Sequence, residues 1–155
     1  MAWTDPTNWQ AGDPLTADRL NTEVKDNLVH LKNKPVVTYQ STSSYSTSST
    51  GYIVVDSTNL SHTLVTEGGN VLILCSGYAT NNTAGSNNHF GVSVDGVDNI
   101  HLSVFTQDVA NRLYPVSFHL LATGLAAGTH TFELKYSTSG GGLFFYRPIF
   151  TAQEL

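Results

Sequence analysis

The sequence predicts an all-β domain preceded by a short N-terminal arm and one α-helix. Two observations support this prediction. From Val36 onward, short stretches separated by polar breaks carry apolar residues at every second position. Before Pro35 the apolar residues follow a helical spacing, and the proline ends that pattern. We therefore expect an anchoring unit over residues 1–35 and a β-domain over residues 36–155, built as a sandwich or a barrel.

The arm contains two tryptophans, Trp3 and Trp9, in a polar segment interrupted by Pro6 and Pro14. Large aromatic side chains gain most when they leave water. The two indoles are therefore expected either to fold back on their own domain or to insert into a neighbouring protein. The second alternative makes Trp3 and Trp9 candidate anchoring residues.

A single helix is expected over residues 16–33, with Thr16 as its N-cap. Its apolar residues recur at spacings of four, four and three and form one narrow stripe: Leu20, Val24, Leu28 and Leu31. An isolated helix of this length is marginally stable in water, so the stripe must be covered. The β-domain or copies of the same helix are the alternatives, and we favour self-association or docking on a partner.

The β-domain is expected to contain ten short strands, at residues 36–40, 52–56, 61–66, 70–79, 89–95, 99–106, 114–121, 129–137, 143–146 and 149–153. Asp95-Gly96 between two of them favours the tight turn of a hairpin. The Ser/Thr-rich segment 41–50 is expected to be a mobile loop, with a glycan-contacting or partner-contacting loop as the alternative.

Composition and charge exclude several classes of partner. Only 12% of the residues are charged and the formal net charge is -5. Because no cluster of Lys and Arg is present, neither nucleic acid nor an anionic membrane surface is expected as a partner. The start of the chain lacks the features of a signal peptide, and no apolar run is long enough to span a bilayer, so we expect synthesis in a cytosol.

The sequence gives no support for catalysis, a cofactor or a metal. The six histidines show no paired spacing typical of zinc sites, and no nucleophile or phosphate-binding motif occurs. Cys75 lies in an apolar run and is expected to be a buried small residue. We therefore expect a protein that is not an enzyme.

The aromatic residues indicate a contact surface. Phe144, Phe145 and Tyr146 are consecutive, so in a strand their side chains must point to both faces of the sheet. One face is expected to be the core, and the other an exposed patch or a subunit interface. The same reasoning applies to Phe105 and Tyr114. We favour a subunit interface over a ligand groove for these five residues.

Two parts of the chain resemble known families. The opening Ala-Trp-Thr-Asp-Pro-Thr-Asn-Trp-Gln-Ala-Gly-Asp, with Leu-Thr-Ala-Asp-Arg-Leu-Asn at 15–21 and Asp-Asn-Leu at 26–28, resembles the N-terminus of small virion proteins of tailed bacteriophages. The remainder resembles the jelly-roll β-sandwich of the tumour-necrosis-factor and C1q type, through residues 77–79, 90–96 and 125–132. Carbohydrate-binding sandwiches share the Gly-Thr-His turn at 128–130.

The resemblance implies a homotrimer on the virion surface, synthesised in the host cytoplasm. The arm and helix would attach it to the major capsid protein or a tail protein, as a decoration or cement protein. Alternatives are the receptor-binding tip of a tail fibre, whose loop 81–88 touches host-surface glycan, or a carbohydrate-binding module. Fold analogy alone does not assign one of these roles.

Overall fold

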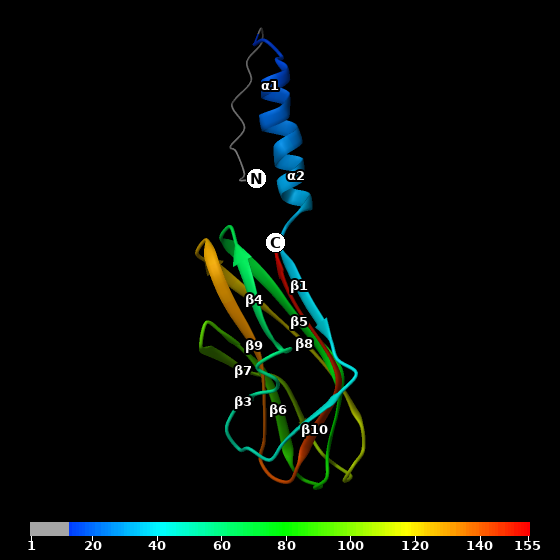
Figure 1. The fold of residues 1–155 in the computed structure, drawn as a ribbon. Coiled ribbons are helices and arrows are strands. Elements are labelled where there is room, and N and C mark those ends of the chain that lie inside the picture. The colour runs from blue at the N-terminus through cyan, green and yellow to red at the C-terminus, as the bar shows by residue number, and fades with distance from the viewer. Residues whose placement is uncertain (1–12) are drawn as a thin grey trace. The chain divides into compact units, whose positions relative to one another are not determined.

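The computed structural model describes residues 13–155 (Figure 1). The chain divides into two compact units, Met1–Lys34 and Pro35–Leu155. Trp3 and Trp9 lie outside the described residues. Within residues 13–155, no helix is both long and apolar enough to cross a lipid bilayer.

The first unit contains the predicted helix, in three consecutive segments. They are α1 (Ala17–Leu20), the π-helical η1 (Asn21–Asp26) and α2 (Asn27–Lys32). Thr16 is the N-cap, because its Oγ1 accepts a hydrogen bond from the Arg19 backbone N–H at 3.2 Å. The helix prediction for residues 16–33 is thus confirmed to within one residue at each end.

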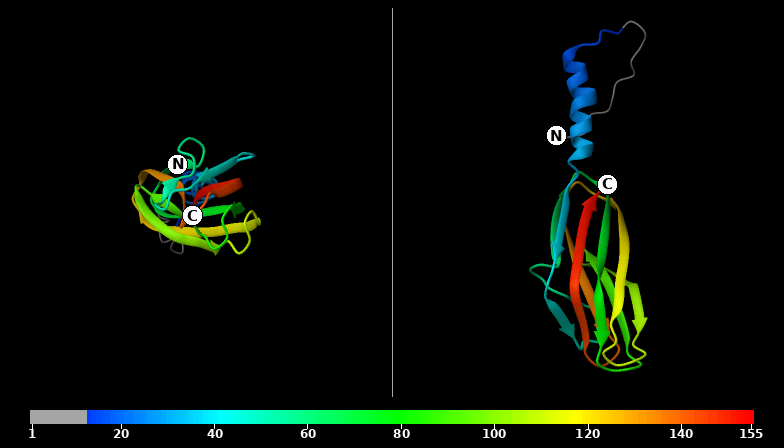
Figure 2. Two further views of the ribbon diagram at one scale, coloured as in Figure 1. Left: turned by 90° about the horizontal axis from the view of Figure 1, so that it is seen from below. Right: turned by 90° about the vertical axis from the view of Figure 1, so that its right-hand side faces the viewer.

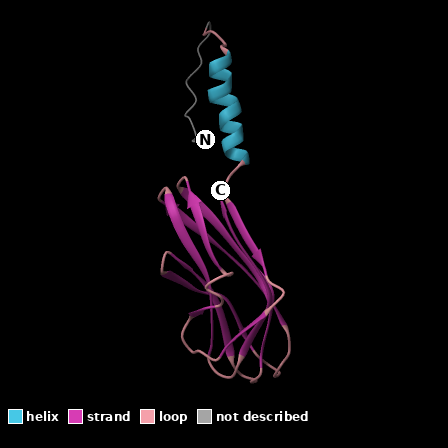
Figure 3. Cartoon of the chain, viewed as in Figure 1, coloured by secondary structure: helices cyan, strands magenta, loops and turns pink. Residues whose placement is uncertain are grey.

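The second unit consists of strands and the loops that join them (Figure 3). The strands are β1 (Val36–Gln40), β2 (Ser44–Thr47), β3 (Ile53–Val54), β4 (Ser61–Thr66), β5 (Gly69–Asn81), β6 (Asn87–Val94), β7 (Val97–Thr106), β8 (Tyr114–Leu125), β9 (Gly128–Thr138) and β10 (Leu143–Glu154). Two differences from the prediction stand out. The expected loop 41–50 contains β2, and the expected strands 143–146 and 149–153 are one strand, β10.

Two antiparallel sheets form a sandwich. The first sheet has the order β1-β10-β5-β8, with β2 also paired to β10; Figure 2 shows these strands side by side. The second sheet has the order β3-β9-β6-β7, with β4 also paired to β9. The predicted all-β sandwich is therefore confirmed.

The strand order is that of a jelly roll. β1 and β2 pair with the last strand, β3 and β4 with β9, β5 with β8, and β6 with β7. The chain is thus one long antiparallel ribbon that is rolled up. The tip of this ribbon is the predicted turn, in which Asp95 (φ 50°) and Gly96 (φ 82°) both have the left-handed backbone that a tight hairpin requires.

The core lies between the sheets and excludes water from its largest side chains. Phe90, Phe132, Phe145 and Phe150 are fully buried, together with Leu60, Ile73, Leu134 and Leu143. Cys75 also belongs to this core, as predicted, and burial raises the pKa of its thiol. The Cys75 side chain is therefore protonated and packs as a small apolar group.

The position of Phe145 corrects one expectation. The pleat of β10 turns Phe145 inward and its neighbours Phe144 and Tyr146 outward. The Phe145 ring lies 4.8 Å from the Phe90 ring, measured between centroids. A side chain with no exposed surface cannot contact another subunit, so Phe145 does not belong to the predicted interface.

Candidate functional site

The outer face of the first sheet carries the main candidate site. The pairing register places Leu72 beside Leu121, and Tyr78 beside Tyr146, across neighbouring strands. Several large apolar side chains on this face are more than a third exposed; they are Val36, Leu74, Tyr78, Leu121 and Ile149. We call this set the apolar face.

The outer face of the second sheet has a different character. Its central strand β9 directs Thr131, Glu133 and Lys135 outward, and Lys135 lies 3.3 Å from the Glu133 carboxylate. In the first sheet, by contrast, the central strands β5 and β10 direct Leu74, Tyr78 and Ile149 outward, and Ser76 and Thr151 lie between them on the same face. The two outer faces therefore differ, because large apolar side chains are exposed on the central strands of the first sheet and a charged pair lies on β9 of the second.

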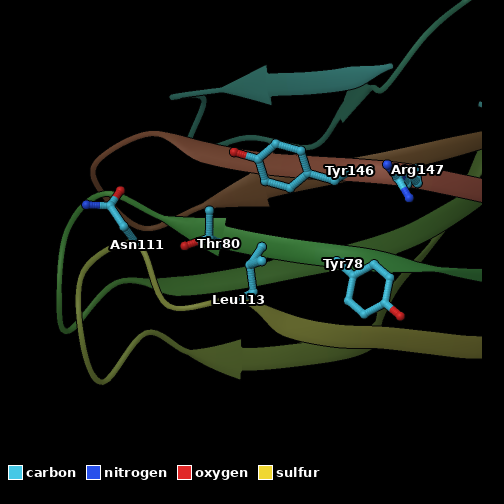
Figure 4. A pocket seen from close by; sticks show the side chains of 6 residues that line it. All are labelled: Tyr78, Thr80, Asn111, Leu113, Tyr146 and Arg147. Carbon is cyan, nitrogen blue, oxygen red and sulfur yellow. The ribbon is translucent and has the colours of Figure 1, made fainter. Parts of the chain in front are cut away.

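The apolar face contains a groove of about 500 Å³ (Figure 4). Tyr78 and Thr80 of β5 form one side, Tyr146 and Arg147 of β10 form another, and the segment before β8 supplies Asn111 and Leu113. Two smaller hollows, of about 300 and 310 Å³, continue the groove along β5 and β8. The face is therefore hollowed along the strands.

Thr80 is the unusual polar residue of this groove. Its side chain is buried, and within residues 13–155 its Oγ1 has no hydrogen-bond partner. A buried hydroxyl without a partner costs free energy. The groove thus combines two tyrosines, a cationic side chain and one unsatisfied hydroxyl.

The predicted interface residues fall in two places. Phe144 and Tyr146 are half-buried beside the groove. Phe105 and Tyr114 lie instead at the sheet edges formed by β7 and β8, with their rings stacked 4.9 Å apart. The Tyr114 hydroxyl donates a hydrogen bond to Asp108, and this bond holds the pKa of that carboxyl below its usual range.

The predicted stripe of the helix is exposed. Leu20, Val24, Leu28 and Leu31 have exposed fractions of 41, 46, 61 and 57%. In the same helix the polar residues Asn27 and His30 are buried. Four exposed aliphatic side chains on one stripe form a second apolar surface, which belongs to the helix.

The loop at residues 81–88, which was considered for glycan contact, is held at its ends by hydrogen bonds within the β-domain. Asn81 and Asn88 at its ends are fully buried, and the Asn81 Nδ2 lies 2.8 Å from Asn88 Oδ1 and 2.9 Å from Thr138 Oγ1. The Gln107 Oε1 accepts a hydrogen bond from the Asn81 backbone N–H at 3.0 Å. Only residues 82–85 and 87 of this loop are exposed.

One cluster was not visible in the sequence. His89 of β6 and His101 of β7 lie with their Nδ1 atoms 3.2 Å apart, and the Tyr52 hydroxyl lies 3.3 Å from the Nδ1 of His101. The two histidines are twelve positions apart in the sequence, so they do not form a motif with the spacing of metal ligands. Within residues 13–155, no group of three or more His, Cys, Asp or Glu side chains is placed to hold a metal.

Comparison with known proteins identifies the architecture and nothing finer. No protein-family model matches the chain, and no curated protein matches its sequence. The VP2 subviral particle of infectious bursal disease virus is similar over 78% of this chain and 32% of its own, with 10% identity and a TM-score of 0.50. VP2 shares the fold. This chain spans about a third of the viral one, and at such low identity the likeness concerns the fold alone.

Two smaller domains are similar over most of their length but at lower structural agreement. A CBM36 domain of a xylanase from the hindgut metagenome of Trinervitermes trinervoides has 11% identity, covers 78% of this chain and 98% of its own, and has a TM-score of 0.45. Eiger TNF from S. frugiperda has 12% identity over 79% and 92% of the two chains, with a TM-score of 0.42. These TM-scores support no functional inference.

Proposed function

We propose that this protein is a non-enzymatic structural protein of a tailed-bacteriophage particle, assembled as a homotrimer on the virion surface. In this proposal the N-terminal arm and helix attach the trimer to the major capsid protein or a tail protein. The β-domain decorates or cements the particle. The resemblance of the N-terminal arm and helix, over about 35 residues, to small phage virion proteins supports the phage origin.

The apolar face is the observation that supports self-association best. Large exposed apolar patches are uncommon on monomeric proteins and usually mark interfaces. A stable interface buries about 800 Å² on each partner. The groove and the two hollows that continue it form a concave surface, into which side chains of a neighbouring copy would pack.

The helix supplies a second surface for the same assembly. Its stripe of Leu20, Val24, Leu28 and Leu31 has the spacing of a short coiled-coil seam. Three copies of this stripe would cover one another around a common axis. The tryptophans of the arm would then be left to contact the particle.

Solution mass by light scattering tests the trimer. The full chain should give about three times its 16.7 kDa mass. Leu74→Glu and Leu28→Glu, placed on the apolar face and on the helix stripe, should each lower this mass or make it concentration-dependent. Val65→Glu is the matched control, because Val65 is exposed on the second sheet. A monomeric full chain, or a trimer untouched by Leu74→Glu, would contradict the proposed interface.

Attachment is tested separately on purified particles. A Trp3→Ala, Trp9→Ala double variant should remain trimeric but should no longer sediment with particles that lack the native protein. If this variant still co-sediments at the native level, the arm is not the anchor.

A second candidate function is binding of host-surface glycan in the groove, as in a tail-fibre tip. The side chains of Tyr78, Tyr146 and Arg147, which line the groove together, favour it. A glycan array probed with the full chain and with Tyr78→Ala distinguishes the two. Glycan binding that the variant loses would support this candidate over a purely structural role.

A further inference from the structure

The strongest unassigned feature lies on the second sheet, away from the apolar face. Three side chains meet there from three separate elements: Tyr52 from the segment before β3, His89 from β6 and His101 from β7. The two imidazole rings are nearly perpendicular, with centroids 5.0 Å apart, and the Tyr52 ring lies 5.7 Å from that of His101. We call this the His–Tyr cluster.

We propose that the His–Tyr cluster is a Zn²⁺ site in which His89 Nδ1, His101 Nδ1 and the Tyr52 hydroxyl oxygen bind one ion and water completes a tetrahedron. Two ligands bonded to Zn²⁺ at about 2.0–2.1 Å in tetrahedral geometry lie about 3.3 Å from each other. In the structure these atoms are in hydrogen-bond contact, and their separations of 3.2 Å between the Nδ1 atoms and 3.3 Å between Tyr52 Oη and His101 Nδ1 are close to this value.

The backbone holds His101 in place for this arrangement. The pairing of β6 with β7 shifts between Phe90↔Ser103 and Val92↔Asn99, so that Gly91 faces three residues, 100–102. His101 adopts a left-handed backbone (φ 60°), which is uncommon for a residue other than glycine. Its backbone N–H donates a hydrogen bond to the Tyr52 hydroxyl oxygen at 3.1 Å.

Gly91 makes this bulge possible. A Cβ at position 91 would lie 2.5 Å from the Asn99 carbonyl oxygen and 3.0 Å from the Ile100 Cα. Both are backbone atoms, which cannot move aside without reshaping the bulge. Strand β7 therefore approaches β6 closely at the point where the two imidazoles meet.

The Asp98 carboxylate supplies a negative charge near the cluster and acts electrostatically on Tyr52. The neighbouring cation, Lys135, lies 3.3 Å from Glu133 and 3.8 Å from Asp98.

Imidazole and phenol oxygen define the class of metal. Neutral imidazole suits Zn²⁺, Cu²⁺ and Ni²⁺, whereas Ca²⁺ and Mg²⁺ require carboxylate and carbonyl oxygens. We commit to Zn²⁺, because its preferred tetrahedron matches the observed separations. A bound ion would join three elements of the second sheet, including the short strand β3, which follows Tyr52 directly.

Calorimetric titration of Zn²⁺ into the full chain, prepared without a histidine tag, tests the site. We expect one ion per chain, and we expect His89→Gln or His101→Gln to weaken binding by more than about 100-fold. Tyr52→Phe should weaken it by about tenfold. His130→Gln is the matched control, since His130 belongs to the same domain but contacts Asp95 and Ala126, and it should bind Zn²⁺ like the native chain.

Two further readouts separate coordination from a structural effect. Co²⁺ in the native protein should give the visible absorption of a four-coordinate site, and this band should be absent in His89→Gln. Circular dichroism should show that each variant remains folded without metal. The proposal is overturned if Zn²⁺ does not bind, or if His130→Gln loses binding as fully as His89→Gln. An unchanged affinity in Tyr52→Phe would overturn the role of Tyr52 as a ligand.

Discussion

Replacing Phe145 with alanine should destabilise the β-domain by about 4 kcal/mol, whereas the same change at Phe144 should cost less than about 1.5 kcal/mol. The two residues are adjacent and chemically identical. They differ only in the face of β10 to which they point. Their comparison therefore tests directly whether the core lies on the side where the structure places it.

The magnitude follows from the surroundings of Phe145. Substituting alanine for a buried phenylalanine costs about 3–5 kcal/mol, and the cost is highest where neighbouring side chains cannot fill the cavity. Phe145 is fully buried, and its ring lies so close to Gly77 that a Cβ there would be 2.6 Å from Cε2. Because Gly77 has no side chain, it cannot fill the space left by the ring.

Urea unfolding of the full chain, followed by circular dichroism at one fixed protein concentration, measures both effects. The concentration must be fixed, because self-association contributes to the apparent stability. If Phe145→Ala does not fold, Phe145→Leu should fold with a loss of about 1–2 kcal/mol, since it keeps most of the volume. Equal losses for Phe144→Ala and Phe145→Ala would refute the assignment of faces on β10.

Three more predictions follow from buried polar groups and from paired histidines. Asn81→Ala should lower the free energy of unfolding in urea by about 2–4 kcal/mol, because it leaves buried hydrogen-bond acceptors unpaired. Asn82→Ala, at the adjacent exposed position, should lower it by less than about 1 kcal/mol. Burial lowers the pKa of His62, so the stability contributed by its neutral, buried form should be fully present above about pH 6.5 and should fall as the pH drops toward the folded-state pKa. Thermal melts at several pH values measure this dependence, and His62→Gln should flatten it. His130 should behave in the opposite way: hydrogen bonding to Asp95 raises its pKa, so its contribution is full below about pH 6.5 and is lost as the pH rises through the folded-state pKa. An NMR titration should show the pKa of His130 falling toward about 6.5 in Asp95→Asn, and no change there would contradict the pairing.

Local chemistry made much of the fold predictable. The Asp95-Gly96 turn and the alternation along β9 are encoded within a few residues, and both were expected from the sequence. Strand β2 was not, because its segment is rich in serine and threonine and is a strand only through its pairing with β10. Strands 143–146 and 149–153 were expected to be separate, but residues 147–148 between them form a shift of register inside the single strand β10.

The candidate sites were harder to predict because they depend on pairing over distance. The position of Phe145 required knowing which side of β10 faces the second sheet, and the alternation alone leaves that choice open. The meeting of His89 and His101 depends on the bulge opposite Gly91. A regular hairpin from the Asp95-Gly96 turn would place His101 opposite Phe90, on the core side. Gly91 was the one local signal, since a glycine inside a strand often marks a bulge.

The rolled-up ribbon has a practical consequence for protein engineering. Because β1 and β10 are neighbours, the two ends of the β-domain meet, and the Glu154 backbone N–H donates a hydrogen bond to the Pro35 carbonyl oxygen at 3.0 Å. A domain whose ends meet can be spliced into a surface loop of a host protein as a cassette, with short linkers on both sides. The same closeness permits circular permutation, with new ends opened in the exposed turn at residues 82–85.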